Sequence, residues 1–288
     1  MGMLLLQACN KILSVPGNAA GQIVTSEVFS DSLNATAGVI GMYASTTTWG
    51  SWYPDIYGGL GADELLYNGT SNTTAIAYYR DSLFAGNSTL ASTSTSFWDT
   101  YYNYNCIYQA NAALEGLAAD SLLSTTARNQ LMGECKFMRS FFYFYLVNRF
   151  GDVPYVTSSN YQVNQRLPRT STGTVYSNLE QDLLQARQFM QPAYPSKGKL
   201  RPNRYTADAL LARLYLYQKQ WSNAESRCDS ILNSGLYSLV SLDNVFLDQS
   251  QEAIWQLGNS STTYSKVAPA SGSVFLPILG IIAPAYSL

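Results

Sequence analysis

The spacing of apolar residues predicts a mostly helical chain, and its clearest helix lies over residues 124–154. Apolar residues recur there at alternating intervals of four and three, as they do along one face of an α-helix. These positions are Leu131, Cys135, Met138, Phe142 and Tyr145. The centre of the segment, FFYFYLV, is apolar around its whole circumference, which predicts a helix that is buried on several sides. Gly151 and Pro154 predict where it ends.

Two more helices are predicted before this one, over residues 30–45 and 96–117. The face expected to be buried on the first comprises Leu33, Ala37, Ile40 and Tyr43 or Ala44. The second begins at Ser96, a residue type that caps helix N-termini. Its expected stripe comprises Trp98, Tyr101 or Tyr102, Asn105, Tyr108, Ala112 and Leu117. Residues 46–96 show little periodicity, which predicts a long elaborated loop with short helical pieces near residues 62–67.

Downstream, residues 174–190 predict a further helix, with Ser177 and Glu180 at the spacing of a capping box near its start. The apolar face of this helix comprises Tyr176, Leu179, Leu183, Ala186 and Met190. Beyond residue 240 the helical pattern stops. A short strand-like alternation follows at Ala253, Trp255 and Leu257.

The segment 204–239 predicts a pair of antiparallel helices. Large and small apolar residues alternate there in the register of a tetratricopeptide repeat. These residues are Leu211, Ala212, Tyr215, Ala224, Cys228 and Ile231. One such pair cannot bury its apolar face alone, so the helices at 131–150 and 174–190 are its expected neighbours. The predicted fold class is therefore mainly α, with tetratricopeptide-like stacked helical hairpins, long loop insertions and little strand.

Composition narrows the classes of function. A chain of 288 residues that is 47% hydrophobic, with a net charge of −2, is typical of a globular protein with a sizeable core. Charged residues make up only 12%, about half the usual share, which is typical of an exported protein. Binding to nucleic acid requires a positively charged surface. The sequence has no cluster of Lys or Arg, so nucleic acid is not an expected partner. No segment has the roughly 18 to 20 uninterrupted apolar residues of a membrane-spanning helix.

The chemistry available to the chain is limited because it contains no histidine. This excludes Ser-His-Asp and Cys-His nucleophiles and every histidine-containing metal site. The four cysteines are far apart and form no C-x-x-C motif, which excludes a metal knuckle. Cys106, Cys135 and Cys228 lie in apolar helical patterns, so buried free thiols are favoured over a disulfide or a reactive site. No cofactor and no metal site is predicted.

Five segments, taken in order, resemble the SusD/RagB family of nutrient-binding outer-membrane lipoproteins. They are SFWDTYYNYNCIYQANAAL, GECKFMRSFFYFYLVNRFGDVPYV, VYSNLEQDLLQA, RYTADALLARLYLYQKQWSNAESRCDSIL and SQEAIWQL. The helix that runs into FGDVP and the hairpin ALLARLYLYQKQW are the most specific parts. The resemblance implies a tetratricopeptide-like helical fold that sits as a lid over a TonB-dependent (SusC-like) outer-membrane barrel. It also implies capture of glycans or peptides for import.

The resemblance implies three parts of the chain. Residues 1–9 are interpreted as a truncated lipoprotein signal that ends at the lipid cysteine, 10–240 as the helical domain, and 241–288 as the start of a loop-rich C-terminal ligand-binding region. The motif LQAC places a leucine and a small residue before Cys9, the predicted lipid attachment site, although the apolar run is short and lacks a basic start. The expected location is the outer membrane, with the protein lipid-anchored and facing the cell exterior. The alternative for Cys9 is a buried structural cysteine.

The segment 49–80 is the predicted ligand-binding region. Neutral sugars bind flat aromatic rings together with amide, carboxylate and guanidinium groups. The predicted ligand-binding residues are Trp49, Trp52, Tyr53, Asp63, Tyr67, Asn72, Tyr78 and Arg80. The alternative for each is that it packs the loop against the helices.

No catalytic residue is predicted. The two carboxylates of a glycosidase lie about 5 to 10 Å apart on opposite sides of the bond, whereas Asp63 and Glu64 are adjacent and point away from each other. The predicted function is therefore a non-enzymatic, cell-surface lipoprotein that captures oligosaccharides and delivers them to a TonB-dependent transporter. Two alternatives stay open: a helical scaffold that binds protein or peptide partners, and a glycoside hydrolase.

Overall fold

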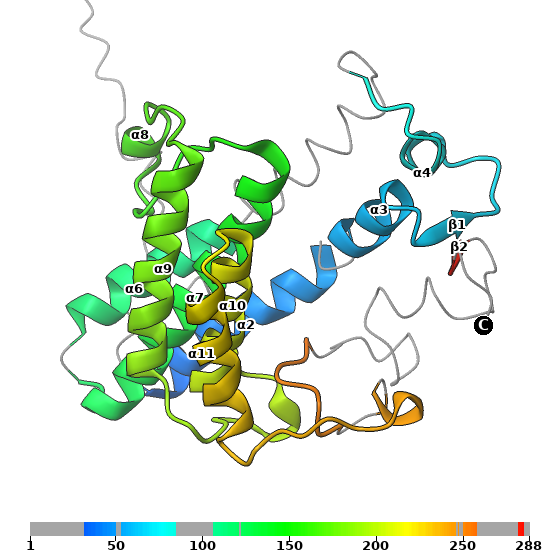
Figure 1. Cartoon of the computed structure of the whole chain (residues 1–288). Coiled ribbons are helices and arrows are strands. Elements are labelled where there is room, and N and C mark those ends of the chain that lie inside the picture. The colour runs from blue at the N-terminus through cyan, green and yellow to red at the C-terminus, as the bar shows by residue number, and fades with distance from the viewer. Residues whose placement is uncertain are drawn as a thin grey trace, which may run out of the picture.

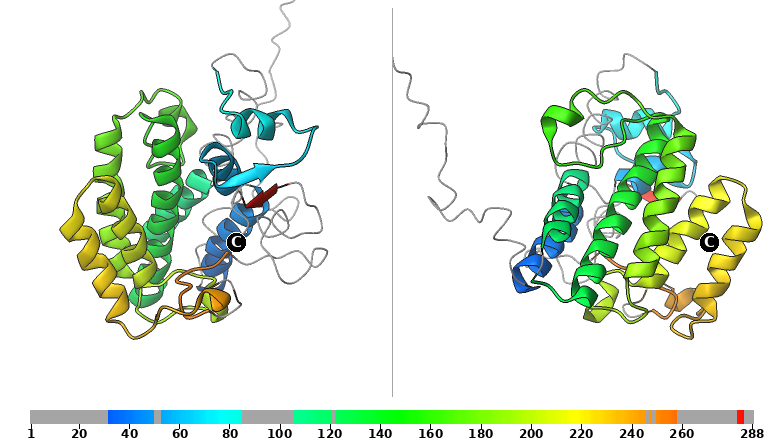
Figure 2. Two further views of the ribbon diagram at one scale, coloured as in Figure 1. Left: turned by 45° about the vertical axis from the view of Figure 1, so that its right-hand side comes forward. Right: turned by 90° about the vertical axis from the view of Figure 1, so that its left-hand side faces the viewer.

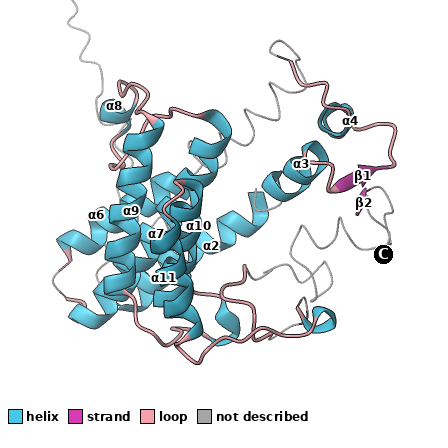
Figure 3. Ribbon diagram, viewed as in Figure 1, coloured by secondary structure: helices cyan, strands magenta, loops and turns pink. Residues whose placement is uncertain are grey.

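The structure of the protein is a computed structural model, which describes residues 32–49, 53–84, 106–120, 122–245, 247, 250–257 and 282–284. Helices dominate these residues (Figure 3), as the sequence predicts. The long helices are α2 (Ser32–Trp49), α6 (Cys106–Ala119), α7 (Thr125–Phe150), α9 (Thr172–Phe189), α10 (Arg204–Tyr217) and α11 (Trp221–Leu232). The short elements are α3 (Tyr53–Gly61), β1 (Leu65–Tyr67), α4 (Thr73–Tyr79), α8 (Tyr161–Asn164), η3 (Lys197–Lys199), η4 (Leu242–Asn244) and β2 (Ile282–Pro284).

The long helices form a stack in which each packs on the next along the chain (Figure 1). The order is α2, α6, α7, α9, α10 and α11, and α7 also contacts α2 and α10. Sequential packing of this kind buries the face of each helix against its neighbours, as helical repeats do. The structure therefore confirms the predicted stacked hairpins, and the short helix α8 lies in the insertion between α7 and α9.

The central helix α7 begins and ends where the sequence predicts. The Ser124 hydroxyl accepts a hydrogen bond from the Ala127 N–H at 3.3 Å, and Gly151 takes a φ of +68° at the C-cap, a conformation that glycine adopts without a steric penalty. Most of the apolar circumference of α7 is buried, as predicted, while Phe141 and Tyr145 are partly buried. The buried residues of its second half include Phe137, Met138, Phe142, Tyr143, Phe144, Leu146 and Val147.

Helices α7 and α9 approach each other closely at Gly133. A Cβ atom at this position would lie 2.6 Å from Met190 Cγ and 3.1 Å from the Ala186 carbonyl oxygen. Any side chain would therefore push α9 away from α7, at a cost in packing. The close contact brings the polar side chains of α7 within reach of those on α9.

The buried face of α2 differs from the prediction. Leu33 and Ile40, which were expected inside, are 80% and 45% exposed. Tyr43 is buried as predicted, and the other buried residues are Ala35, Val39 and Met42. The predicted face was wrong because this helix carries small and apolar residues on several sides, so periodicity alone does not select one of them.

Four further details of the sequence interpretation are corrected. Tyr108 on α6 is half exposed, and Cys228 on α11 is exposed, whereas Cys106 and Cys135 are buried free thiols as predicted. Helix α9 is capped by Ser171, which accepts from the Thr174 N–H, so the expected capping box further along does not form. Residues 253–257 are irregular and not a strand. Trp255 packs on the core instead, with its ring centroid 5.2 Å from that of Phe137.

Candidate functional site

The segment predicted to bind ligand does not form one long loop. Elements α3, β1 and α4 pack on one another as a small group beside the helix stack (Figure 2), coloured blue to cyan. We call this group the aromatic cluster. Its buried residues are Ile56, Tyr57, Leu60, Tyr67, Ala75 and Tyr78. The expected helical pieces near residues 62–67 were wrong, since a turn and strand β1 stand there.

Local chemistry explains how the aromatic cluster folds. Gly59 faces Leu65 so closely that a Cβ would lie 2.8 Å from Leu65 Cδ1, so a larger residue there would require the Leu65 side chain to shift. Strand β1 pairs antiparallel with β2, and Tyr67 lies opposite Ile282. This pairing fixes which side chains of β1 face the cluster.

Two of the predicted ligand-binding residues hold α4 in place. Asn72 is the N-cap of α4, where its Oδ1 accepts from the Ala75 N–H at 3.0 Å. The Asn72 backbone N–H donates to the Tyr67 hydroxyl at 3.0 Å, and the Tyr67 ring is buried. Both side chains thus have structural partners, and their role in ligand binding stays a prediction.

Tyr78 is the centre of the aromatic cluster. Its ring is buried, with the centroid 5.0 Å from that of Tyr57. Arg149 of α7 donates a hydrogen bond to the Tyr78 hydroxyl. The half-buried ring of Tyr79 packs on the outside of the cluster. Within the described residues, the tyrosines expected to be sugar platforms therefore lie mainly in the interior.

Asp63 and Arg80 are the charged members of the predicted set, and both are exposed, as is Asn72. Asp63 lies in the turn between α3 and β1 with a φ of +59°, a left-handed conformation that aspartate tolerates better than most residues. Arg80 is the C-cap of α4, and its backbone N–H donates to the Ile76 carbonyl at 3.0 Å. Their charged groups face solvent, and both are held on elements that the buried tyrosines fix. We call these two residues the polar rim.

The remaining predicted residues cannot be placed in the same way. Trp49 is the last residue of α2 and Tyr53 the first of α3, but the structure does not describe their side chains. Trp52 and Cys9 lie outside the described residues. Their assigned roles stay predictions.

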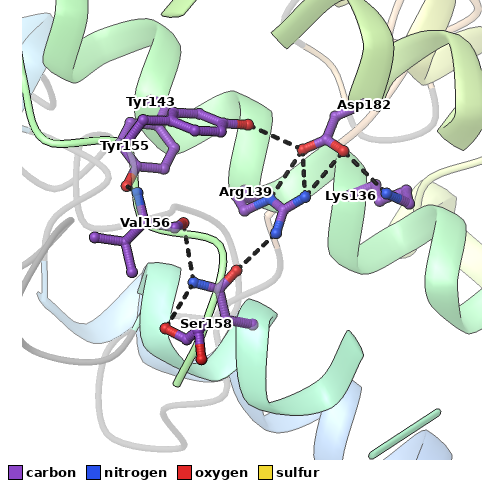
Figure 4. A network of polar contacts seen from close by, with 8 residues as sticks. Lys136, Arg139, Tyr143, Tyr155, Val156, Ser158 and Asp182 are labelled. Carbon is purple, nitrogen blue, oxygen red and sulfur yellow. Dashed lines mark hydrogen bonds and ion pairs between the residues drawn. The ribbon is translucent and has the colours of Figure 1, made fainter. Parts of the chain in front are cut away.

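Sequence reasoning missed a buried polar network between α7 and α9 (Figure 4). Arg139 donates to Asp182 from Nε at 2.8 Å and from Nη2 at 2.9 Å, and Lys136 Nζ donates to the same carboxylate at 3.0 Å. Arg139 also donates to Asn111 Oδ1 on α6 at 2.8 Å. The Asn111 amide donates to the Val156 carbonyl oxygen at 3.1 Å. The network thus ties three helices to the insertion after α7.

Protonation supports a structural role for this network. The Tyr155 hydroxyl donates to Asp182 at 3.2 Å, and burial, followed by the nearby carboxylate, raises the pKa of Tyr155. Burial lowers the pKa of Arg139, but the charge and hydrogen bond of Asp182 together with the nearby tyrosines outweigh it, so the pKa is raised overall. Both groups therefore keep their protons, and each is already bonded within the protein. A buried and satisfied network of this kind specifies packing and leaves no group free for a substrate.

A second buried network surrounds Glu134 on α7. Arg201 donates to it at 2.6 and 3.0 Å, from Nη2 and Nε, and the Tyr43 hydroxyl of α2 donates at 2.8 Å. Gln130 Nε2 donates at 2.9 Å. Glu134 therefore joins α2, α7 and the segment before α10. Over the residues that the structure describes, no three His, Cys, Asp or Glu side chains gather as metal ligands would.

The described helices contain no segment that is both long and apolar enough to cross a membrane. Together, the fold and the aromatic cluster define a helical-repeat protein of tetratricopeptide type with a small solvent-facing side group. The sequence model of SusD-like proteins, described as "Starch-binding associating with outer membrane", matches residues 63–216, just over half of the chain. The chain belongs to the SusD-like family, which confirms the resemblance drawn from its sequence.

Three relatives show how far the similarity extends. SusD-like protein P25 of Formosa agariphila is 26% identical over 235 residues, which cover 79% of this chain and 44% of the relative. A SusD superfamily protein from Parabacteroides distasonis has a TM-score of 0.70 at 24% identity, covering 85% of this chain and 54% of that structure. A laminarin-binding SusD-like protein has a TM-score of 0.62 at 23% identity, covering 75% and 46%. The chain thus spans about half the length of these relatives, and the solved structures establish the shared fold.

Proposed function

We propose that the chain is a non-enzymatic glycan-binding lipoprotein that captures oligosaccharides at the cell surface. The observation that carries the proposal is membership of a family described as starch-binding, over a match that includes the aromatic cluster from Asp63 onward. A relative of the same fold is named for laminarin binding. The polar rim supplies a carboxylate and a guanidinium, which bind sugar hydroxyls well because charged hydrogen bonds are the stronger kind.

The exposed guanidinium of Arg80 is expected to contribute directly to glycan affinity. Arg80→Ala should weaken binding about tenfold or more, the typical effect of losing a hydrogen bond from a charged group. The melting temperature should stay within a degree or two, because the Arg80 side chain is exposed and its capping hydrogen bonds come from the backbone. Retardation of the protein in native gels that contain laminarin or soluble starch measures the affinity of each variant.

The matched control is Arg166→Ala, since Arg166 is also exposed but follows α8, away from α4 (Figure 1). It should bind like the unmodified protein. Equal retardation of all three proteins would remove Arg80 from the site, and no retardation of the unmodified protein would contradict both glycans as ligands. Release of reducing ends during incubation would instead support a hydrolase.

We further propose that Cys9 carries a lipid and that the partner is a TonB-dependent outer-membrane barrel. The LQAC motif supports the anchor, and the family description places its members at the outer membrane. Two or more acyl chains hold a protein stably at a membrane. In a Gram-negative host that expresses the gene with its native leader, radioactive palmitate should label the protein and Cys9→Ser should abolish the label. A barrel protein should co-purify with the labelled form only, and a label that survives Cys9→Ser would contradict the anchor.

A further inference from the structure

The aromatic cluster meets the helix stack at one arginine. Arg149 lies in the last turn of α7 and donates from Nη2 to the Tyr78 hydroxyl of α4. The Cζ atom of Arg149 also lies 5.4 Å from the centroid of the Tyr78 ring, within the range of a cation–π contact. A single guanidinium therefore contacts both the ring and the hydroxyl of the residue at the centre of the cluster.

Two features of the surroundings act on the charge of Arg149: the helix dipole favours it, and burial opposes it. The negative end of the α7 dipole stabilises a positive charge in the last helical turn. Arg149 is only partly accessible to solvent, and burial lowers the pKa of its guanidinium. Partial desolvation strengthens both the hydrogen bond and the cation–π contact, since water screens neither of them fully.

Tyr78 is connected to both residues of the polar rim, through α3 to Asp63 and through α4 to Arg80. Tyr78 packs on Tyr57 of α3, the helix that leads into the turn of Asp63. On α4, Arg80 follows Tyr78 by two residues and is joined to the same helix by its backbone N–H. A displacement of Tyr78 would therefore move both charged groups of the rim relative to the stack.

We propose that Arg149 is a positioning residue that fixes the aromatic cluster, and with it the polar rim, on the C-terminal end of α7. The inference rests on the proposed glycan-binding function. Arg149 acts through Tyr78, and its loss lowers glycan affinity by releasing the cluster from the stack.

The test compares Arg149→Met, Arg149→Lys and a matched control, Arg213→Met. Methionine keeps the length of the side chain but removes the charge and every donor. Lysine keeps the charge but lacks the planar fork that reaches ring and hydroxyl together. Arg213 is an exposed arginine on α10 that also donates to a tyrosine hydroxyl, that of Tyr145 at 3.5 Å, far along the chain from the cluster.

Two measurements separate positioning from general stability. Hydrogen exchange of amides in β1 and α4 should become about tenfold faster in Arg149→Met, the usual effect of losing a charged hydrogen bond, while amides of α9 and α10 keep their protection. Affinity for laminarin and soluble starch, measured by gel retardation, should fall by a similar factor. Arg149→Lys should give intermediate values in both measurements, and Arg213→Met should match the unmodified protein.

The outcomes distinguish the two proposals. Faster exchange spread evenly over β1, α4, α9 and α10 would overturn the inference, because Arg149 would then support the whole fold. Unchanged exchange in Arg149→Met would overturn it as well. Selective loss of protection in β1 and α4, with no glycan bound even by the unmodified protein, would support Arg149 as the anchor of the cluster and contradict the proposed function alone.

Discussion

Replacement of Asp182 by alanine is expected to lower the free energy of unfolding by about 3–5 kcal/mol, as removal of one partner of a buried ion pair does. Asp182 is 6% exposed and accepts hydrogen bonds from Arg139, Lys136 and Tyr155. Without the carboxylate, the Arg139 guanidinium remains buried with half of its partners missing. The cost arises mainly from this uncompensated charge and not from the loss of an attraction.

Chemical denaturation followed by circular dichroism measures this change. Asp182→Asn, which keeps the shape and one acceptor oxygen, should fall between alanine and the unmodified protein. Asp229→Ala is the control, since Asp229 is exposed on α11 and exposed substitutions usually change stability by less than about 0.5 kcal/mol. A value for Asp182→Ala as small as that of the control would contradict a structural network at this site.

Loss of the Glu134 carboxylate is expected to have an effect of the same size. Glu134→Ala should cost about 3–5 kcal/mol, because its side chain is fully buried and forms an ion pair with Arg201 at 2.6 Å. The Tyr43 hydroxyl would lose its acceptor as well. Burial and the neighbouring carboxylate raise the pKa of Tyr43 well above its usual value, so this hydroxyl stays protonated and would remain an unsatisfied donor.

Asp182→Ala and Glu134→Ala should differ in which helices lose protection from hydrogen exchange. Glu134 joins α2 to α7, so Glu134→Ala should expose α2 amides to hydrogen exchange before those of α9 and α10. Glu134→Gln keeps an acceptor for Tyr43 and should retain part of the stability. Glu225→Ala, at an exposed site on α11, is the matched control. Uniform exchange across all helices, or a loss no larger than that of the control, would contradict the assigned role.

The candidate site could be predicted from sequence only in part. The residue types of a sugar site could be recognised between positions 49 and 80, and the structure leaves Asp63, Asn72 and Arg80 exposed there. The tyrosines are a different case, because Tyr67 and Tyr78 proved to be buried. A tyrosine in the sequence does not reveal whether its ring stacks on a sugar or is buried in a core. Only the residues that surround it in space distinguish the two roles.

The buried networks left a signal in the sequence that was not used. Asp182 follows Leu179 by three residues and precedes Ala186 by four, so it lies on the buried face of its helix. Arg139 follows Cys135 by four residues, so it also lies on the buried face of its helix. A charge on an apolar stripe requires a buried partner. Its identity is not encoded locally, because Arg139 and Asp182 are 43 residues apart.

The sequence by itself determined the properties that depend on near neighbours along the chain. Helix α7 follows from its periodicity and ends at Gly151, and the ordered motifs identified the SusD-like family. The tertiary structure alone decided which face of α2 is buried, that Cys228 is exposed, and that residues 53–79 form a cluster around Tyr78. Helix formation is governed by contacts three and four residues apart, whereas burial is governed by segments that meet only when the chain has folded.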